Sequence, residues 1–423
     1  MYRYAFGYRT RPDTRWRAPA PAHFCHPVAE LLRAVSSAAS TRFLHRLLLE
    51  ESSVSGTTDA PAGVILPINL GLNDGTYAPQ SVADAMVRLA TRTGLRNYTE
   101  GTNRRLRECI AEVDGVSPDN VFLHNGSGPI LKMVVPFLVR REIKKSAVRI
   151  FKHLTIKKGY PLVTPRLTYS KVPKKGEKAG LTVEMVPLEP ETGFTLDVDN
   201  IEAAVRRRDS FVYICSPNNP TGNVLITRDE VERLARSYPR SIFWIDEAYV
   251  QYVDPKEHDY VAPLAGKLPN VMVGRTFSFA YGMAGLRLGY LLADAELVKA
   301  LNAQLTDYRV GTLHEELGIA ALTDTAHLPD LRERCAEARS VLTQGFSRFE
   351  GVEMFPSKTN FVLGRFTDGR TGAWLRAELE KKGVLIKKFD NWSTQRYDEF
   401  FRLTVGTPEE NAFLVAKAAE VLG

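Results

Sequence analysis

Short apolar runs alternate with longer segments of mixed polarity between residues 115 and 290. The runs that begin at Val121, Phe211, Ser241 and Val271 are rich in β-branched and aromatic residues. Continuous apolar runs of this kind are typical of strands that are buried on both faces of a parallel sheet, with helices between them. The pattern therefore predicts an α/β fold with a mostly parallel sheet.

The two ends of the chain follow different patterns. Residues 294–350 favour helices and lead into a second domain, whereas residues 28–50 favour one amphipathic helix. Ser52–Gly63 is rich in Gly, Ser, Thr and Pro, which is typical of a linker. We expect three parts: an N-terminal extension and linker over 1–60, a large domain over 93–310, and a small domain made of 61–92 and 311–423.

The composition is that of a globular protein with a large core. The 423 residues are 44% hydrophobic and 25% charged, and no apolar run reaches the length of a membrane span. The four cysteines are scattered without metal-ligand spacing, which favours reduced thiols in a cytoplasmic protein and predicts no metal site. A net charge of +7 suits small anions such as phosphates and carboxylates, and does not by itself imply nucleic acid.

Positive charge is concentrated in two stretches. Residues 1–46 contain eight Arg, no Lys and only two acidic residues, and they lack the apolar core of a signal peptide. This stretch suits either an organelle transit peptide or a plain extension, and we favour the extension. Between Lys144 and Lys178 lie nine Lys and two Arg against the single acid Glu177. A patch for an anionic partner or acidic carrier protein remains open there, but we favour a solvated surface because neither aromatic interleaving nor a groove motif accompanies the charge.

A glycine-rich loop follows the apolar run that begins at Val271. Its sequence, Thr276–Tyr290, is TFSFAYGMAGLRLGY. It resembles the cofactor-lysine loop of class I/II aminotransferases, which are pyridoxal phosphate (PLP) enzymes of fold type I. The closest pattern is T-x-S-K-x-x-G-x-A-G-x-R-x-G of histidinol-phosphate aminotransferases, matched here by Ser278, Gly282, Ala284, Gly285, Arg287 and Gly289. The Schiff-base lysine of the family is replaced by Phe279.

Similar segments run in family order from about Ile68 to the C-terminus. They are INLGLNDGTYAP at Ile68, LRNYTEG at Leu95, GSG at Gly126, PRLTYS at Pro165, SPNNPTG at Ser216, DEAY at Asp246, PSKTNF at Pro356, GVLIKK at Gly383 and RLTVGTPEEN at Arg402. The resemblance implies the fold-type-I architecture. A large domain would hold a mostly parallel, seven-stranded type of sheet, and a smaller α+β domain would lie towards the C-terminus.

The resemblance also implies a site for PLP or pyridoxamine phosphate. Backbone N–H groups and an Arg suit a phosphate, so the implied phosphate ligands are Ser127, Gly128, Ser278, Arg287 and, from the partner subunit of a homodimer, Tyr98. Tyr169 would stack on the pyridine ring, Asp246 would pair with the pyridinium nitrogen, and Asn219 and Tyr249 would bind the phenolic oxygen. The implied substrate ligands are Asn360, Arg402, Lys387 and Tyr77.

Phe279 sets this chain apart from the pattern because phenylalanine has neither a nucleophile nor a titratable proton. A positioned acid–base group contributes about 10²–10⁴ to a rate, so ordinary transamination through position 279 is excluded. Three interpretations remain. The protein binds the cofactor or its adduct non-covalently and acts on an amino acid or keto acid, with an anionic side chain suggested by Lys387; or it is a catalytically silent homologue with a binding or scaffold role; or Phe279 was introduced experimentally. We favour the first.

Overall fold

The computed structural model describes residues 64, 66–90, 95–99, 101–144, 161–305, 309–387, 389 and 397–423. Residues 60–423 form one compact unit. The expectations for the N-terminal extension and for most of the basic stretch before residue 161 lie outside the described residues. None of the described helices has the length and apolar character needed to cross a membrane.

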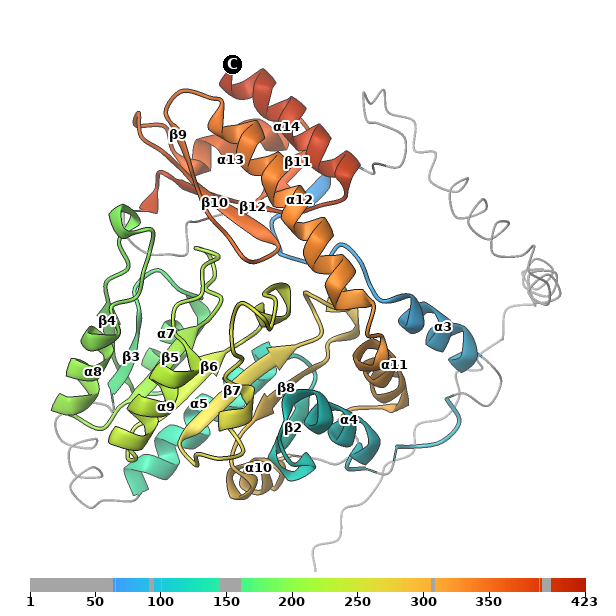
Figure 1. Ribbon diagram of the computed structural model, residues 1–423, viewed down its shortest axis with the longest axis vertical. Coiled ribbons are helices and arrows are strands. Elements are labelled where there is room, and N and C mark those ends of the chain that lie inside the picture. The colour runs from blue at the N-terminus through green and yellow to red at the C-terminus, as the bar shows by residue number, and fades with distance from the viewer. Residues whose placement is uncertain are drawn as a thin grey trace, which may run out of the picture. The chain divides into compact units, whose positions relative to one another are not determined.

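A central sheet of seven strands confirms the predicted α/β architecture (Figure 1). Five neighbouring strands run parallel, and β8 pairs antiparallel with both of its neighbours. The four apolar runs singled out in the sequence all lie in this sheet. In spatial order the strands are β2 (Val121–His124), β8 (Gly289–Leu292), β7 (Val271–Thr276), β6 (Ile242–Asp246), β5 (Phe211–Cys215), β3 (Pro161–Pro165) and β4 (Thr182–Val186).

Helices cover both faces of this sheet, and the strands alternate between two apolar cores. Along β5, Val212 and Ile214 pack in one core with α8 (Val198–Arg207) and α9 (Arg228–Ser237). Phe211, Tyr213 and Cys215 pack in the other core with α5 (Ser127–Lys144) and α7 (Lys171–Lys178). Burial of both faces explains why the strands read as continuous apolar runs in the sequence. Further helices near the sheet are α4 (Arg104–Asp114) and α10 (Ala295–Asn302).

The C-terminal part builds a three-stranded antiparallel sheet in the order β12 (Phe400–Thr404), β10 (Phe361–Phe366), β9 (Val352–Phe355). It is accompanied by α12 (His327–Ser347), α13 (Gly372–Lys381) and α14 (Pro408–Leu422), drawn in orange and red in Figure 1. Near the N-terminal end of the described chain, β1 (Ile68–Leu70) pairs in parallel with β11 (Val384–Ile386).

Two helices connect these parts. Helix α3 (Gln80–Leu89) packs against α11 (Thr312–Thr323), and α11 also packs against α4. The side chain of Asn103 ties the start of α4 to this region, since it donates to the backbone oxygen of Val310 at 3.0 Å and to Glu315 at 2.9 Å. The division of the chain into a large and a small domain at residues 93 and 311 stays a prediction.

A buried ion cluster fixes the segment that follows β6. The Arg275 guanidinium donates to Glu247 at 2.7 and 2.9 Å and to Asp114, and all three side chains are almost fully buried. Burial raises the pKa of Asp114, and the charge of Arg275 opposes that shift. A buried charge without a partner is costly, so the three side chains have to stay together. The cluster therefore holds α4, β7 and Glu247 next to one another. It thereby holds Asp246, the residue before Glu247, in place.

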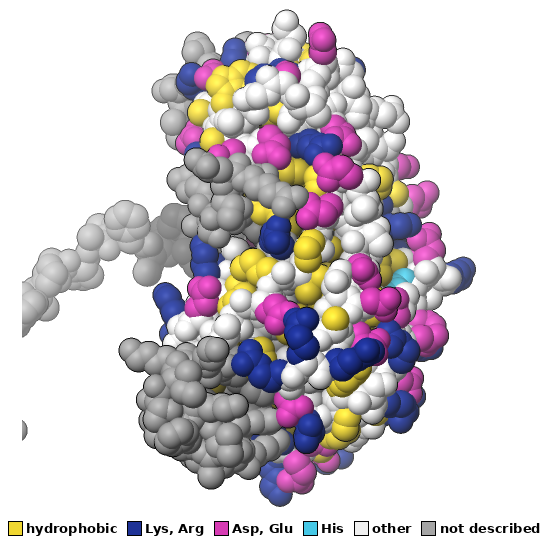
Figure 2. Space-filling view, turned by 90° about the vertical axis from the view of Figure 1, so that its left-hand side faces the viewer, with side chains coloured by type: hydrophobic (Ala, Val, Ile, Leu, Met, Phe, Trp, Pro, Cys, Tyr) yellow, Lys and Arg dark blue, Asp and Glu magenta, His cyan; other side chains and the backbone are white. Residues whose placement is uncertain are grey.

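One face of the molecule carries closely mixed charges. Figure 2 shows Lys and Arg side chains lying beside Asp and Glu side chains on this face. On α8 and α9, Arg206 and Arg233 both pair with Glu202, and Arg236 pairs with Glu232. Exposed pairs of this kind contribute little stability, so these helices are held to the sheet by their apolar faces.

Candidate active site

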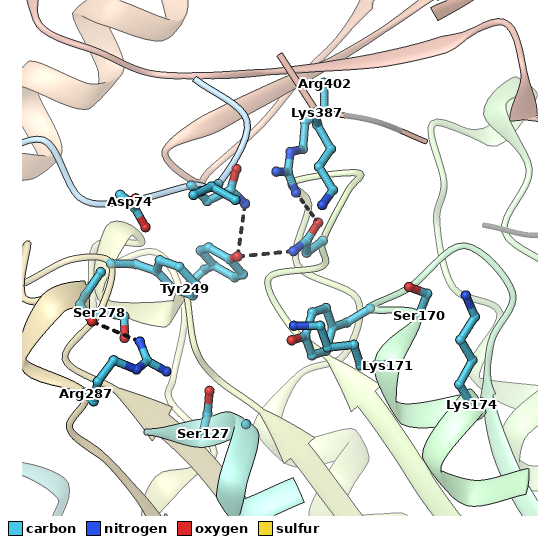
Figure 3. Close-up of a pocket in the computed structure, with 17 residues that line it drawn as sticks. Asp74, Ser127, Ser170, Lys171, Lys174, Tyr249, Ser278, Arg287, Lys387 and Arg402 are labelled. Carbon is cyan, nitrogen blue, oxygen red and sulfur yellow. Dashed lines mark hydrogen bonds between the residues drawn. The ribbon is translucent and has the colours of Figure 1, made fainter. Parts of the chain in front are cut away.

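A cavity of about 520 Å³ lies where the parallel strands of the central sheet end (Figure 3). Segments that follow β2, β3, β5, β6 and β7 line it on one side, as expected for an open α/β sheet. The segment after β1, the residue after β11 and strand β12 line it on the other. Ten of the residues predicted from the sequence meet here: Ser127, Gly128, Tyr169, Asn219, Tyr249, Ser278, Phe279, Arg287, Lys387 and Arg402.

One end of the cavity is built to hold an anion. Helix α5 begins at Ser127, so its first backbone N–H groups and its partial positive charge lie at the cavity wall. Arg287 faces the same space and is held by a 2.9 Å hydrogen bond from its Nη1 to the oxygen of Ala284. A Cβ atom at Gly126 would lie 2.7 Å from Nη2 of Arg287, so only glycine lets the guanidinium come this close to the helix start. Together with Ser278, this end has the donors and the charge that a phosphate requires.

A chain of hydrogen bonds crosses the centre of the cavity. The Tyr249 hydroxyl accepts from Nδ2 of Asn219 at 3.1 Å and from Nδ2 of Asn73 at 3.0 Å. Nη1 of Arg402 donates to Oδ1 of Asn219 at 2.8 Å, and its Nη2 donates to the oxygen of Gly71 at 2.9 Å. Burial raises the pKa of Tyr249, so its hydroxyl stays protonated at neutral pH. Since two amides already donate to this oxygen, its own proton remains for a ligand.

Two buried polar atoms at the Arg402 end have no hydrogen-bond partner in the part of the chain that the structure describes. They are Nε of Arg402 and Oδ1 of Asn360. Burial lowers the pKa of Arg402 to about 10, which still leaves the guanidinium charged at neutral pH. A buried charge with an unused donor favours an anionic ligand, and a carboxylate matches the guanidinium geometry.

Asp246 lies behind the cavity wall at the end of β6. Its Oδ2 accepts from the Tyr213 hydroxyl at 2.6 Å, and its Oδ1 accepts from the backbone N–H of Ala248 at 3.2 Å. Burial raises the pKa of this carboxyl to about 6, against the effect of both hydrogen bonds. In the cavity itself, Tyr169 offers an aromatic wall. A flat, positively charged ring fits between such a wall and a buried carboxylate.

The Phe279 ring forms part of the cavity wall and makes an aromatic contact there. Its ring stacks on Tyr249, with ring centroids 4.5 Å apart and planes 9° from parallel. Position 279 is therefore occupied by an apolar ring packed against the second core.

Besides Asp246, three predicted residues do not line the cavity. Asn360 lies just outside it and donates to the backbone oxygen of Asn73 at 3.0 Å. The Tyr77 ring lies instead against the guanidinium of Arg334, 5.2 Å from its centroid. Tyr98 is 85% exposed in the single chain and does not line this cavity.

Sequence reasoning also missed residues that line the cavity: Asn73, Asp74, Ser170, Lys171 and Lys174. Asn73 matched the family pattern without being assigned a role, although its contact with Tyr249 and its left-handed backbone (φ 62°) set it apart. The two lysines follow Tyr169 closely in the sequence, and this proximity was the signal available for them.

The central sheet, its strand order and the cavity at its carboxyl edge define the fold of type I PLP-dependent enzymes. Two solved structures share it. Histidinol-phosphate aminotransferase from Sinorhizobium meliloti, in complex with pyridoxal-5'-phosphate, superposes with a TM-score of 0.70 at 24% identity, over 95% of this chain and 98% of that one. The enzyme of the same name from Clostridium acetobutylicum gives a TM-score of 0.71 at 19% identity, over 84% and 98%.

The sequence comparison identifies the family. Residues 66–417 match the profile of aminotransferase class I and II, and the chain belongs to that family. Histidinol-phosphate aminotransferase of Gluconacetobacter diazotrophicus is 32% identical over 358 residues, which cover 84% of this chain and 91% of that protein. Its counterpart in Symbiobacterium thermophilum is 32% identical over 356 residues, with the same coverage.

The raised pKa of Asp246 predicts a pH-dependent stability difference for Asp246→Asn in the absence of ligand. The folded state holds this proton more tightly than the unfolded chain, so the carboxyl weighs against folding as pH rises from about 4 to about 6. Asparagine cannot ionise, and the Tyr213 hydroxyl can turn to accept from it. In urea unfolding, the advantage of the variant should grow over this window to about 3 kcal/mol. A difference that does not change with pH contradicts the shift.

Proposed function

We propose that the protein is an aminotransferase-like enzyme that holds PLP or pyridoxamine phosphate without a covalent link at position 279. Its substrate would be an amino acid or keto acid with an anionic side chain. The observation that carries the proposal is the cavity itself. Its anion end, its aromatic wall, the buried Asp246 and the unused donor of Arg402 all suit such ligands, although Phe279 stacks where the family pattern has lysine.

Each group of residues would bind one part of the cofactor. Ser127, Gly128, Ser278 and Arg287 would hold the phosphate, and Tyr169 would cover one face of the ring. Asp246 would keep the ring nitrogen protonated, while Asn219 and the Tyr249 hydroxyl would fix the oxygen of the ring. The cofactor, when bound, supplies an electron sink for bonds at the substrate's α-carbon.

The substrate would be oriented by the other end of the cavity. The Arg402 guanidinium would bind a carboxylate through its unused Nε, close to Asn360. Lys387 lines the cavity near Arg402 (Figure 3) and would meet an anionic side chain. The names of the two relatives denote a phosphorylated substrate, which agrees with an anion in this region.

The absence of a lysine at position 279 limits the reactions that this cavity would catalyse. Without an amine at position 279, proton transfer at the substrate depends on another group, and the loss of a positioned acid–base group is about 3–5 kcal/mol in barrier height. A catalytically silent homologue remains the alternative. It is favoured by the same stacking of Phe279 on Tyr249, which closes the position with an apolar contact.

We expect a homodimer, because the family resemblance gives Tyr98 to the partner's cofactor site and its side chain is 85% exposed in the single chain. An aromatic side chain of this exposure is suited to burial at an interface. Sedimentation velocity at micromolar protein should give the mass of two chains. A monomer at that concentration contradicts the shared site.

Binding of the cofactor should depend on Arg287. PLP and pyridoxamine phosphate should each bind saturably, measured by equilibrium dialysis. Arg287→Ala should weaken both by about 10- to 100-fold, because it removes charge-assisted hydrogen bonds to the phosphate. Arg236→Ala, on the exposed face of α9, is the matched control and should bind like the parent. If the parent binds neither compound below millimolar concentration, the enzyme proposal fails and the silent homologue replaces it.

Phe279→Lys should restore the covalent attachment. With PLP and borohydride, the variant should gain a stable modification at position 279, identified by peptide mass spectrometry. It should be less stable than the parent without cofactor, since the packing of a partly buried ring is lost at about 1–2 kcal/mol, and should recover when PLP is added. Phe279→Met removes the same ring without adding an amine and separates the two effects.

Two outcomes of this experiment lead to different conclusions. A linked and active variant means that the cavity differs from an aminotransferase site at one position. A folded Phe279→Lys variant that binds PLP but is modified at no lysine of the cavity means that the cavity has changed elsewhere too, and the residue roles proposed above would be wrong as a set.

A further inference from the structure

Three amines line the cavity in addition to the two arginines already assigned. They belong to Lys171, Lys174 and Lys387, and the described lining offers a single carboxylate, that of Asp74. A concave site with this excess of positive charge attracts anions. The phosphate and carboxylate sites account for Arg287 and Arg402 only. The three lysines therefore need an explanation of their own.

Lys171 is the amine that lies over the aromatic wall. Its Nζ is 5.7 Å from the centroid of the Tyr169 ring, over the ring face. Stacked rings lie about 4.5–7 Å apart between centroids, so this amine occupies the same layer as a ring that stacks on Tyr169. Figure 3 shows Lys171 extending into the cavity, whereas Lys174 lies at its edge and Lys387 beside Arg402.

Local structure places Lys171 there. It is the first residue of α7, immediately after the Tyr169–Ser170 segment that leaves β3, and Val172 next to it is buried in the second core. Among the described residues Lys171 forms no ion pair with a carboxylate. Its surroundings are positive instead: burial and the charges of Lys171, Lys132 and Lys178 lower the pKa of the neighbouring Lys175. Such a cluster attracts an anionic ligand, and the unprotonated form of a lysine amine is a nucleophile.

We infer that Lys171 supplies the reactive amine that position 279 lacks, and that it links reversibly to an aldehyde held in the phosphate end of the cavity. In that step the neutral Nζ attacks the aldehyde carbon. The nitrogen loses its two protons, the carbonyl oxygen leaves as water, and a carbon–nitrogen double bond forms without any change in oxidation state. Borohydride supplies the hydride that makes the bond permanent in the test. The inference rests on the proposed function, because it needs PLP in the cavity.

The test is to map the link. The full chain is mixed with an equimolar amount of PLP, reduced with borohydride, digested and analysed by mass spectrometry. We expect the reduced adduct on Lys171, at a level about tenfold or more above that on the exposed Lys256, since the cavity concentrates the aldehyde. Lys171→Arg keeps the charge but cannot form the link, so the adduct should disappear. Lys174→Arg is the matched control, one turn further along α7, and should keep the adduct on Lys171.

Arg287→Ala separates a directed reaction from the general labelling of surface lysines. It should lower the adduct on Lys171 by about tenfold, in line with the lost phosphate contacts, and leave that on Lys256 unchanged. Equal loss at both positions, or at neither, contradicts delivery through the cavity.

The outcomes distinguish this inference from the proposed function. If PLP binds in dialysis and Lys171→Arg binds it too, but the parent carries no adduct or carries it on Lys174 or Lys387, the inference is wrong and the proposed function stands. If PLP does not bind at all, both fail. Binding to Lys171→Arg also shows that this variant is folded.

Discussion

The hydrogen bonds around the Tyr249 hydroxyl are the constraint on which the site depends. Asn219 comes from the loop after β5, Asn73 from the segment after β1, and Arg402 from β12, and all three are buried. Asn73 also accepts from Thr404 at 2.9 Å through its side chain. One tyrosine therefore ties together the central sheet, the N-terminal strand segment and the C-terminal sheet. Because each amide has a single arrangement that satisfies all of its partners, the network fixes the positions of these segments around the cavity.

Phe279 lies beside this network and contacts Tyr249 through its ring face. Its ring contributes an offset aromatic contact with Tyr249, an interaction of about 0.5–1.5 kcal/mol beyond simple burial. A lysine at the same position would bring an amine that needs a partner in a largely apolar wall. The stack therefore stabilises this wall of the cavity by itself, whereas the amine of a lysine would need the cofactor as its partner.

The fold was predictable because its signals are local and repeated. Apolar runs such as Phe211–Cys215 report burial on both faces directly, and turns such as SPNNPTG have few structural alternatives. Many of the predicted residues that line the cavity lie in loops after such strands, whereas Ser127 begins α5 and Arg402 lies in β12. Asn73 and Lys171 were missed for a different reason: what matters about them is the distance to Tyr249 and to the Tyr169 ring, and these distances arise only when segments far apart in the chain, or on two sides of a turn, come together. Likewise, Tyr213 reads as an ordinary core residue until its hydroxyl is seen to donate to Asp246.

Two buried ionisable side chains of the site, Asp246 and Arg402, have no partner of opposite charge among the described residues. Burial raises the pKa of Asp246 to about 6 and lowers that of Arg402 to about 10, so each charged form is disfavoured where it stands. No ion pair joins these two residues among the described contacts, since Arg402 lines the cavity from β12 and Asp246 lies behind its wall at the end of β6. A ligand with a positive ring nitrogen near Asp246 and a carboxylate near Arg402 would relieve both costs at once. The charges therefore favour a complex of cofactor and amino acid over either alone. They would also bring such a complex into the cavity that the amine of Lys171 lines, over the Tyr169 ring.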